Sequence, residues 1–136
     1  MVDRVLFLDT LAIYMARVHS FQRKSTLALR QRRLAIVRSL GIPSRAIRAS
    51  VVERFGTCGT AGCSCHTGTK HGPYYYLTQC VAKGTVRKFL LKSPESQQLA
   101  RECVEAFNSF YDSLEELSQI NLELLRRGEP LKEVGS

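Results

Sequence analysis

A glycine- and cysteine-rich segment in the middle of the chain constrains the fold more than any other feature. Residues 56–72 hold five glycines, three cysteines and two histidines, and no large apolar side chain that could form a core. Cysteine thiolates and histidine imidazoles are the ligands that zinc prefers, and four of them close the tetrahedral shell of a structural site. We therefore expect a bound metal ion to hold this loop in place.

The spacing of these residues suggests which of them bind the metal. His66 is adjacent to Cys65, and neighbouring residues rarely point the same way, so we favour His71 as the histidine ligand. Cys80 is an alternative outside the loop. The candidate ligands of one structural Zn²⁺ are Cys58, Cys63, Cys65 and His71. A cluster of reduced cysteines in a mobile loop is the alternative without metal, and the odd total of five cysteines argues against a disulfide framework.

The surroundings of the cysteines argue against catalysis. A catalytic zinc ion keeps one ligand position open, and a base usually stands nearby. Residues 55–94 contain no Asp or Glu. We therefore expect a structural site and no enzymatic activity. A zinc enzyme that borrows a distant carboxylate, or a cysteine nucleophile at Cys65 beside His66, is the less favoured alternative.

The regions on either side of the loop show helical and strand patterns. Apolar residues recur at helical spacing over about 3–20 and again up to Gly41, and Pro43 suits the first turn of a short helix over 43–48. Aromatic and β-branched residues predict strands over 49–55, 74–81 and 85–91, with a turn at Lys83-Gly84. Ser93-Pro94-Glu95 is typical of a helix start, and we expect that helix over 95–126.

These elements predict an α+β fold with basic N-terminal helices, a small three-stranded antiparallel sheet carrying the zinc-binding loop, and a long C-terminal helix. We divide the chain into a basic helical region, 1–48, and a region of sheet and long helix, 49–136, and expect one compact domain. The long helix carries a heptad seam of Cys103, Phe107, Phe110, Leu114, Leu117, Asn121 and Leu124. Either the basic helices or a second copy of the chain covers this seam. Asn121 could pair with its equivalent in a homodimer, or lie at a wet helix end.

The charge of the chain is unevenly distributed. The net charge is +8 over residues 1–54, +5 over 55–92 and −5 over 93–136. Glu53 is the single carboxylate between Asp9 and Glu95, among 15 basic residues. Like charges repel, and a bound polyanion would relieve that repulsion, so we expect nucleic acid, either DNA or RNA, as the partner. A surface kept basic for solubility, or one that faces the acidic end of the chain, is the alternative.

The candidate nucleic-acid contacts are basic residues of the predicted helices and sheet, together with two tyrosines. Tyr74 and Tyr76 share one face of a strand, and aromatic rings beside cations suit stacking with unpaired bases. The full set is Arg23, Lys24, Arg30, Arg32, Arg33, Arg38, Arg45, Arg48, Lys70, Tyr74, Tyr76, Arg87 and Lys88. We expect phosphate contacts rather than base readout from the arginines of the second helix. The alternative function is a protein–protein adaptor whose basic helices bind an acidic partner.

Other partners and the location follow from what the sequence lacks. No uncharged run reaches the about 20 residues that span a bilayer, so we expect no membrane association. Charged residues interrupt the apolar N-terminal run, and we expect a cytoplasmic protein. The helix over 95–126 could dimerise or bind a protein such as a recombinase or transposase.

Part of the chain resembles a known family. Cys58-Gly59-x3-Cys63-x-Cys65 followed by His71-Gly72-Pro73-Tyr74-Tyr75-Tyr76-Leu77, with the ending Glu116–Arg126, is similar to an uncharacterised bacterial and archaeal domain family, over about residues 49–127. Thr60 stands where that family usually has Lys, and the turn Lys83-Gly84 has the reversed order. The resemblance implies the ligand set Cys58, Cys63, Cys65 and His71, and no established activity. Members of that family are often encoded near mobile elements, which would fit a nucleic-acid partner.

Overall fold

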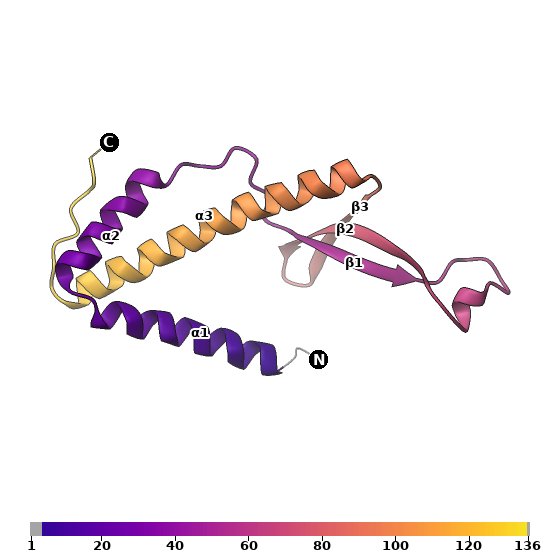
Figure 1. The fold of residues 1–136 in the computed structure, drawn as a ribbon, viewed down its shortest axis with the longest axis horizontal. Helices are drawn as coiled ribbons and strands as arrows, with labels where there is room; N and C mark the ends of the chain where they lie inside the picture. The colour runs from indigo at the N-terminus through magenta and orange to yellow at the C-terminus, as the bar shows by residue number, and fades with distance from the viewer. Residues whose placement is uncertain (1–3, 136) are drawn as a thin grey trace. The chain divides into compact units, whose positions relative to one another are not determined.

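The structure is an α+β protein (Figure 1). The computed structural model describes residues 4–135, with side chains from residue 11 onward. The elements are α1 (Arg4–Arg23), α2 (Thr26–Ser39), β1 (Ser50–Gly56), the short 3-10 helix η1 (Ser64–His66), β2 (His71–Ala82), β3 (Thr85–Leu91) and α3 (Pro94–Arg126). They confirm the predicted fold class. The described chain forms two compact units, a helical unit of residues 4–42 and 110–135 and a sheet unit of residues 43–109, and each is described by itself.

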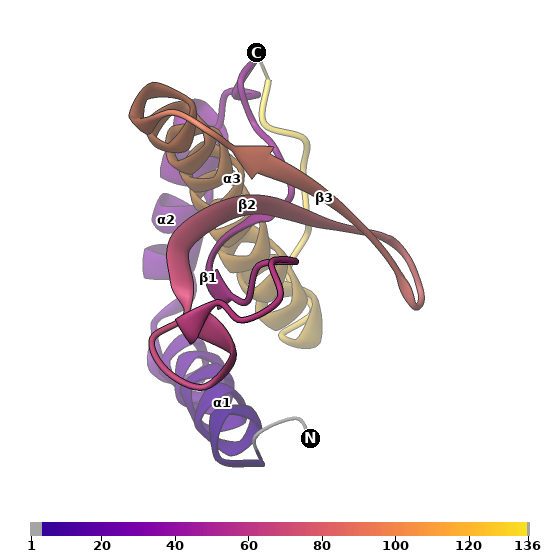
Figure 2. The same ribbon diagram turned by 90° about the vertical axis from the view of Figure 1, so that its right-hand side faces the viewer.

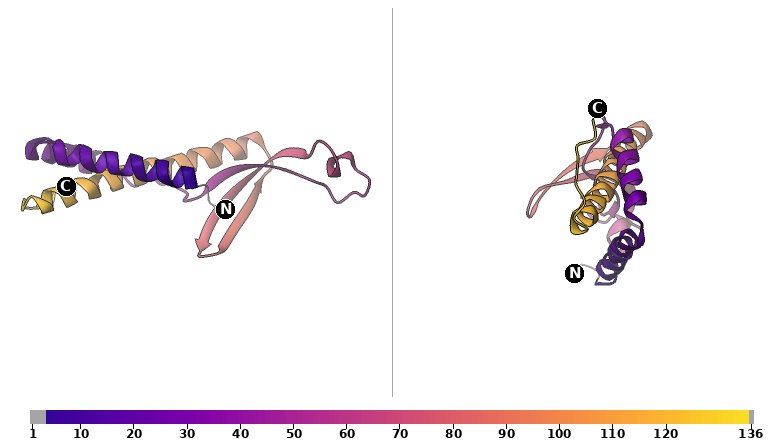
Figure 3. Two further views of the ribbon diagram at one scale, coloured as in Figure 1. Left: turned by 90° about the horizontal axis from the view of Figure 1, so that it is seen from below. Right: turned by 90° about the vertical axis from the view of Figure 1, so that its left-hand side faces the viewer.

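The two N-terminal helices of the helical unit follow the predicted pattern closely. α1 runs three residues beyond the helix expected over 3–20, and residue 3 lies outside the described residues. The Ser25 hydroxyl accepts a hydrogen bond of 3.1 Å from the Ala28 N–H and so caps the start of α2. Leu40 leaves the helical conformation and ends α2 just before Gly41. Figure 3 shows the α1–α2 junction beside the C-terminal end of α3.

The core of the helical unit joins all three helices. Its buried members are Phe21, Leu29, Ile36, Ile120 and Leu124. Burial of one such side chain stabilises the fold by about 1.5–3 kcal/mol. The heptad seam that we predicted for α3 is therefore only partly the buried one: Ile120 lies off the seam and is fully buried, whereas Leu114 lies on the seam and is 44% exposed. A straight α-helix drifts by about 20° per heptad from a seven-residue repeat, so the face that α2 covers departs from that seam.

Asn121 finds its partner within the chain. The Arg33 Nε–H donates a hydrogen bond of 2.8 Å to Asn121 Oδ1. The side chain is half-buried in this contact with α2. An Asn–Asn pair with a second copy is therefore not needed to satisfy it.

A buried carboxylate fastens the end of α3 to the α1–α2 junction. Glu123 is 6% exposed and accepts hydrogen bonds of 2.7–2.9 Å from the guanidinium groups of Arg126 and Arg127. Arg127 also donates to the backbone oxygens of Phe21 and Gln22 at 3.3 and 3.1 Å. One guanidinium thus bridges α3 to the carbonyl groups that end α1, the type of group that a helix leaves without an internal partner.

The ends of α3 are specified locally. The Ser93 hydroxyl accepts a hydrogen bond of 3.1 Å from the Ser96 N–H and caps the helix start, which the sequence predicted one residue later than observed. At the other end Gly128 has φ +73°, and the Glu129 N–H reaches the Leu124 carbonyl at 3.0 Å. This is the glycine-dependent helix stop known as the Schellman motif. Within residues 4–135, no helix combines the length and apolar character of a membrane span.

The sheet unit is built on three antiparallel strands in the order β1–β2–β3, with β2 in the centre (Figure 2). The three predicted strands are confirmed, and β3 has the predicted bounds. The prediction of a short helix over 43–48 is wrong. The Ala46 N–H closes a single turn on the Pro43 carbonyl, and the Ile47 N–H then donates to the Cys103 carbonyl at 3.0 Å. A backbone bond to α3 thus replaces the next turn of a helix.

Candidate functional site

The loop between β1 and β2 carries the cysteine and histidine cluster. Gly56 pairs with His71 across the two strands and closes the loop at its base. Cys58 follows β1, and Cys63 and Cys65 lie at the start of η1. His71 is the first residue of β2. The ordered strand ends and the short helix bring four residues that are up to 13 positions apart in the sequence to one place.

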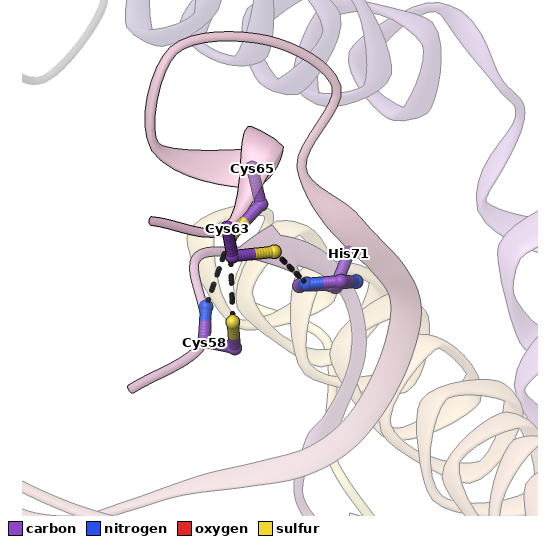
Figure 4. Close-up of side chains that lie close together, drawn as sticks. All are labelled: Cys58, Cys63, Cys65 and His71. Atoms are coloured by element: carbon purple, nitrogen blue, oxygen red, sulfur yellow. Dashed lines mark hydrogen bonds between the residues drawn. The ribbon is translucent and has the colours of Figure 1, made fainter. Parts of the chain in front are cut away.

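The four side chains converge (Figure 4). Their ligand atoms all lie within 4.8 Å of one another. Cys58 Sγ lies 3.5 Å from Cys65 Sγ, and Cys63 Sγ lies 3.4 Å from His71 Nε2. Cys65 is buried, and the other three remain accessible to different degrees. Three thiols and one imidazole in this arrangement could bind a metal ion.

The competing candidates lie outside this cluster. His66 Nε2 lies 3.1 Å from the Thr60 carbonyl oxygen, within its own loop. The exposed Cys80 thiol donates to the Ala82 carbonyl at 3.3 Å. Cys103 is buried in α3, and none of the five cysteines forms a disulfide. Among the described side chains, the cluster that could hold a metal ion consists of the four residues favoured from the spacing.

Gly72 allows His71 to lie beside β1, and sequence reasoning missed its role. Its φ of +139° is a conformation that favours glycine. A Cβ atom at this position would lie 2.8 Å from the Phe55 ring and 2.9 Å from the Arg54 carbonyl oxygen. Both distances are shorter than a non-bonded carbon can tolerate. The position of Gly72 directly after the candidate ligand His71 was the sequence feature that could have indicated this role.

The cluster favours the deprotonated form of two of its three thiols. Hydrogen bonding by the Thr60 backbone, followed by that of the other cluster side chains, lowers the pKa of Cys58 to about 6. The Cys65 backbone lowers the pKa of Cys63, and interaction with Cys63 raises the pKa of His71. At Cys65 the Cys58 backbone N–H favours the thiolate, but burial and the neighbouring thiols outweigh it and raise the pKa. Metal ligands of this kind bind as thiolates, so two of the three thiols are already biased towards the form that binds a metal ion.

The strand register divides the sheet into two chemically different faces. Directly paired residues lie on the same face, and successive residues of a strand alternate between faces. One face, here called the tyrosine face, comprises Ser50, Val52, Arg54, Tyr74, Tyr76, Thr78, Cys80, Val86, Lys88 and Leu90. It carries both candidate tyrosines and Lys88. Arg54, which the sequence analysis did not select, pairs directly with Tyr74.

The opposite face packs towards α3 within the sheet unit. The Arg101 guanidinium lies over the Tyr75 ring at 5.2 Å, a cation–π contact. Gln97 of α3 donates to the Leu91 carbonyl at 3.2 Å. Arg87 belongs to this face, where it lies over the Phe89 ring at 5.3 Å. The register therefore separates Arg87 from the two tyrosines with which the sequence grouped it.

Several of the candidate arginines form contacts with other residues of the helical unit. Arg30 forms an ion pair with Glu129, and Arg32 donates two hydrogen bonds of 2.7 Å to Glu116. The carboxylate of Glu116 holds the pKa of Arg32 above its ordinary value, chiefly through those hydrogen bonds. The Arg32 contact and the Arg33–Asn121 bond connect α2 to α3, and the Arg30–Glu129 pair connects α2 to the segment that follows α3. Among the described residues, the exposed Arg23 and Arg38 have no ion-pair partner.

The sheet unit leaves more of its positive charge without a carboxylate partner. Arg45 pairs with Glu102 at 2.6 Å. Arg48 donates to the Cys80 carbonyl at 3.2 Å. Lys70 and Lys88 are exposed, and within the described part of the chain neither has an ion-pair partner. The remaining candidate, Lys24 of the helical unit, lies over the Phe21 ring at 5.1 Å.

Comparison with known proteins places the chain in a family. Residues 26–99 match the model of Domain of unknown function (DUF6788), and the chain belongs to that family. The matched segment contains α2, the whole sheet and the Cys/His cluster. It begins upstream of residues 49–127, the part of the chain over which the sequence motif resembles a family. No curated protein and no solved structure matches the chain.

Proposed function

We propose that this protein is a zinc-stabilised nucleic-acid-binding protein. In this proposal the metal ion holds the loop of the sheet unit, and the basic residues of that unit bind phosphates. The observation that carries the proposal is the excess of positive charge without a carboxylate partner in residues 43–109. The resemblance to a family often encoded near mobile elements suggests an accessory subunit of a mobile-element, recombination or ribonucleoprotein complex.

The cluster has the donors and spacing that suit zinc. Zinc–sulfur bonds of about 2.3 Å in a tetrahedron place two sulfur atoms about 3.8 Å apart. The distance of 3.5 Å between Cys58 Sγ and Cys65 Sγ is close to this value. Zinc–nitrogen bonds are shorter and place a sulfur and a nitrogen ligand about 3.5 Å apart, close to the 3.4 Å between Cys63 Sγ and His71 Nε2. Four protein ligands leave no open position, and residues 57–70 contain no carboxylate that could act as a base. These features support a structural zinc ion and a role without catalysis.

The charge balance supports the sheet unit as the phosphate-binding part. Residues 43–109 contain nine Lys or Arg and four Asp or Glu. Within the described residues, Arg45 is the one of these nine that pairs with a carboxylate. In the helical unit, by contrast, Arg30 and Arg32 bind the chain's own acidic residues. An uncompensated cationic surface is the electrostatic footprint expected of a nucleic-acid-binding domain.

Fluorescence anisotropy tests this function. Zinc-loaded, nuclease-treated protein is titrated onto labelled random single-stranded DNA, duplex DNA and structured RNA at about 50 and about 200 mM salt. Five phosphate contacts with a single strand predict a loss of affinity of about 100-fold between these salt concentrations. Failure to bind any of the three at the lower salt would refute the proposal and direct attention to an acidic protein partner.

A pair of matched double variants locates the charge that matters. Lys70→Gln with Lys88→Gln removes two uncompensated cations and should lower both the affinity and the salt dependence. Arg30→Gln with Arg32→Gln removes the same charge from side chains held by carboxylates and should change the affinity less. A larger effect of the second pair would contradict the assignment to the sheet unit.

A further inference from the structure

The tyrosine face combines two tyrosine rings with two cations and has no carboxylate. On the central strand, Tyr74 and Tyr76 are two residues apart and so lie about 6.7 Å apart along it. The Tyr74 side chain is 44% exposed, and Leu90, which pairs with Tyr76, is also 44% exposed. Tyr76 itself is half-buried, so the exposed ring of Tyr74 and the partly covered ring of Tyr76 are the flat apolar surfaces that this face offers.

Positive charge flanks these rings on both sides. Arg54 on β1 is directly opposite Tyr74, and Lys88 on β3 is directly opposite Thr78, two residues beyond Tyr76. The tyrosine face contains no carboxylate, since Glu53, the single acidic residue of the three strands, pairs with Tyr75 on the opposite face. Rings in the centre with cations at either side match a ligand that presents both bases and phosphates.

We propose that the tyrosine face binds unpaired nucleotides of a single-stranded nucleic acid. Tyr74 and Tyr76 stack with two bases, while Arg54 and Lys88 bind phosphates. This inference rests on the proposed nucleic-acid function and specifies its ligand. In a duplex the bases are stacked on one another and paired, so their faces are closed to a protein ring, whereas a single strand exposes them.

The charge of the face also distinguishes this ligand from a second copy of the chain. Two tyrosine faces brought together would oppose Arg54 and Lys88 of one copy to the same cations of the other, with no carboxylate on either face to compensate. Like charges placed directly opposite across an interface destabilise it. A polyanion removes that repulsion, and the rings of Tyr74 and Tyr76 then contact bases.

The test compares rings with aliphatic side chains of similar size. Zinc-loaded wild type should bind a labelled single-stranded oligonucleotide at least about tenfold more tightly than the duplex of the same sequence. Replacement of both rings by Tyr74→Leu and Tyr76→Leu should weaken single-strand binding by about tenfold or more. Tyr74→Phe with Tyr76→Phe keeps the stacking surface and should stay within about threefold of wild type.

A matched control lies on the opposite face. Phe89 is 48% exposed, close to the 44% of Tyr74, but belongs to the face that packs towards α3. Phe89→Leu should therefore leave single-strand affinity within about threefold of wild type. Since the chain has five tyrosines and no tryptophan, quenching of tyrosine fluorescence on binding gives a second readout. That quenching should fall in the Tyr74→Phe and Tyr76→Phe protein, which does not depend on how well the leucine variant folds.

The outcomes separate this inference from the proposed function. If single and double strands bind equally, and the leucine and wild-type proteins have the same affinity, the tyrosine face is not the site, although nucleic-acid binding itself stands. If the phenylalanine variant loses no quenching, base stacking on these rings is refuted. If no nucleic acid binds and an acidic protein binds the tyrosine face instead, both proposals fail.

Discussion

Glu123 should contribute more to the stability of the helical unit than its other carboxylates. It accepts hydrogen bonds from Arg126 and Arg127, and these bonds, that of Arg126 first, lower its pKa from an ordinary value near 4.5 to about 2. Such a shift corresponds to about 3.4 kcal/mol at most. Because the Arg126 side chain is 63% exposed, water screens part of the attraction. We therefore expect Glu123→Gln to lower the free energy of unfolding by about 2 kcal/mol at pH 7.

A neighbouring ion pair provides the control. Glu129 and Arg30 form an ion pair on the same unit, but their side chains are 29% and 50% exposed. Glu129→Gln removes the same charge and should cost only about 0.5 kcal/mol. Urea unfolding followed by circular dichroism measures both variants. Equal losses for the two would contradict the argument that burial makes the Glu123 pair strong.

The pH dependence gives a second check on Glu123. Its pKa is lower in the folded state than in the unfolded state, so its contribution is complete above about pH 4.5 and is lost as the pH falls towards about 2. The stability difference between wild type and Glu123→Gln should therefore be constant from pH 7 to about 5 and shrink below that. A difference that does not change between pH 7 and 2.5 would refute the explanation by charge.

Two further predictions concern the Cys/His loop. Gly72→Ala should weaken zinc binding and unfold the loop, because the added Cβ atom would clash with Phe55 and the backbone. Gly59→Ala is the control and should have little effect, since no atom lies within 4 Å of its added Cβ atom. Zinc competition titrations compare the two variants, and equal zinc affinities would contradict the role of Gly72. His71→Ala should release the zinc ion, whereas His66→Ala should retain it. Metal analysis of the purified variants measures the zinc content. Loss of zinc from the His66 variant alone would show that His66, and not His71, is the ligand.

The sequence predicted features that depend on local patterns. The composition of residues 85–91 and the cysteine spacing predicted β3 and the clustered side chains, because strand propensity and loop closure act over few residues. Ser93 and Pro94 likewise marked the start of α3. In each case the residues that determine the structure are neighbours in the chain.

Other features depend on pairings that no local pattern contains. Arg32 binds Glu116, which lies 84 residues away in the chain. The sequence allowed the basic residues to face the acidic end of the chain, but it could not show which arginines pair with which carboxylates. The register of β1 and β2 decides that Arg54 joins Tyr74, and a shift of one residue would have placed it on the opposite face. The buried face of α3 also drifts away from a strict seven-residue repeat, so Ile120 is buried in the core and Leu114 is exposed.

The most direct test of a zinc-stabilised nucleic-acid-binding protein is one binding titration performed in two metal states. The affinity of a labelled single-stranded oligonucleotide is measured with zinc-loaded protein, with protein stripped by a chelator, and after zinc is restored. Because the loop is anchored at Gly56 and His71, next to the Arg54–Tyr74 pair, its unfolding should disturb the tyrosine face. We predict that stripping weakens binding by about tenfold or more, that zinc restores it, and that the restored protein holds one zinc ion per chain. Absence of binding in the zinc-loaded state, or equal affinity with and without zinc, would contradict the account.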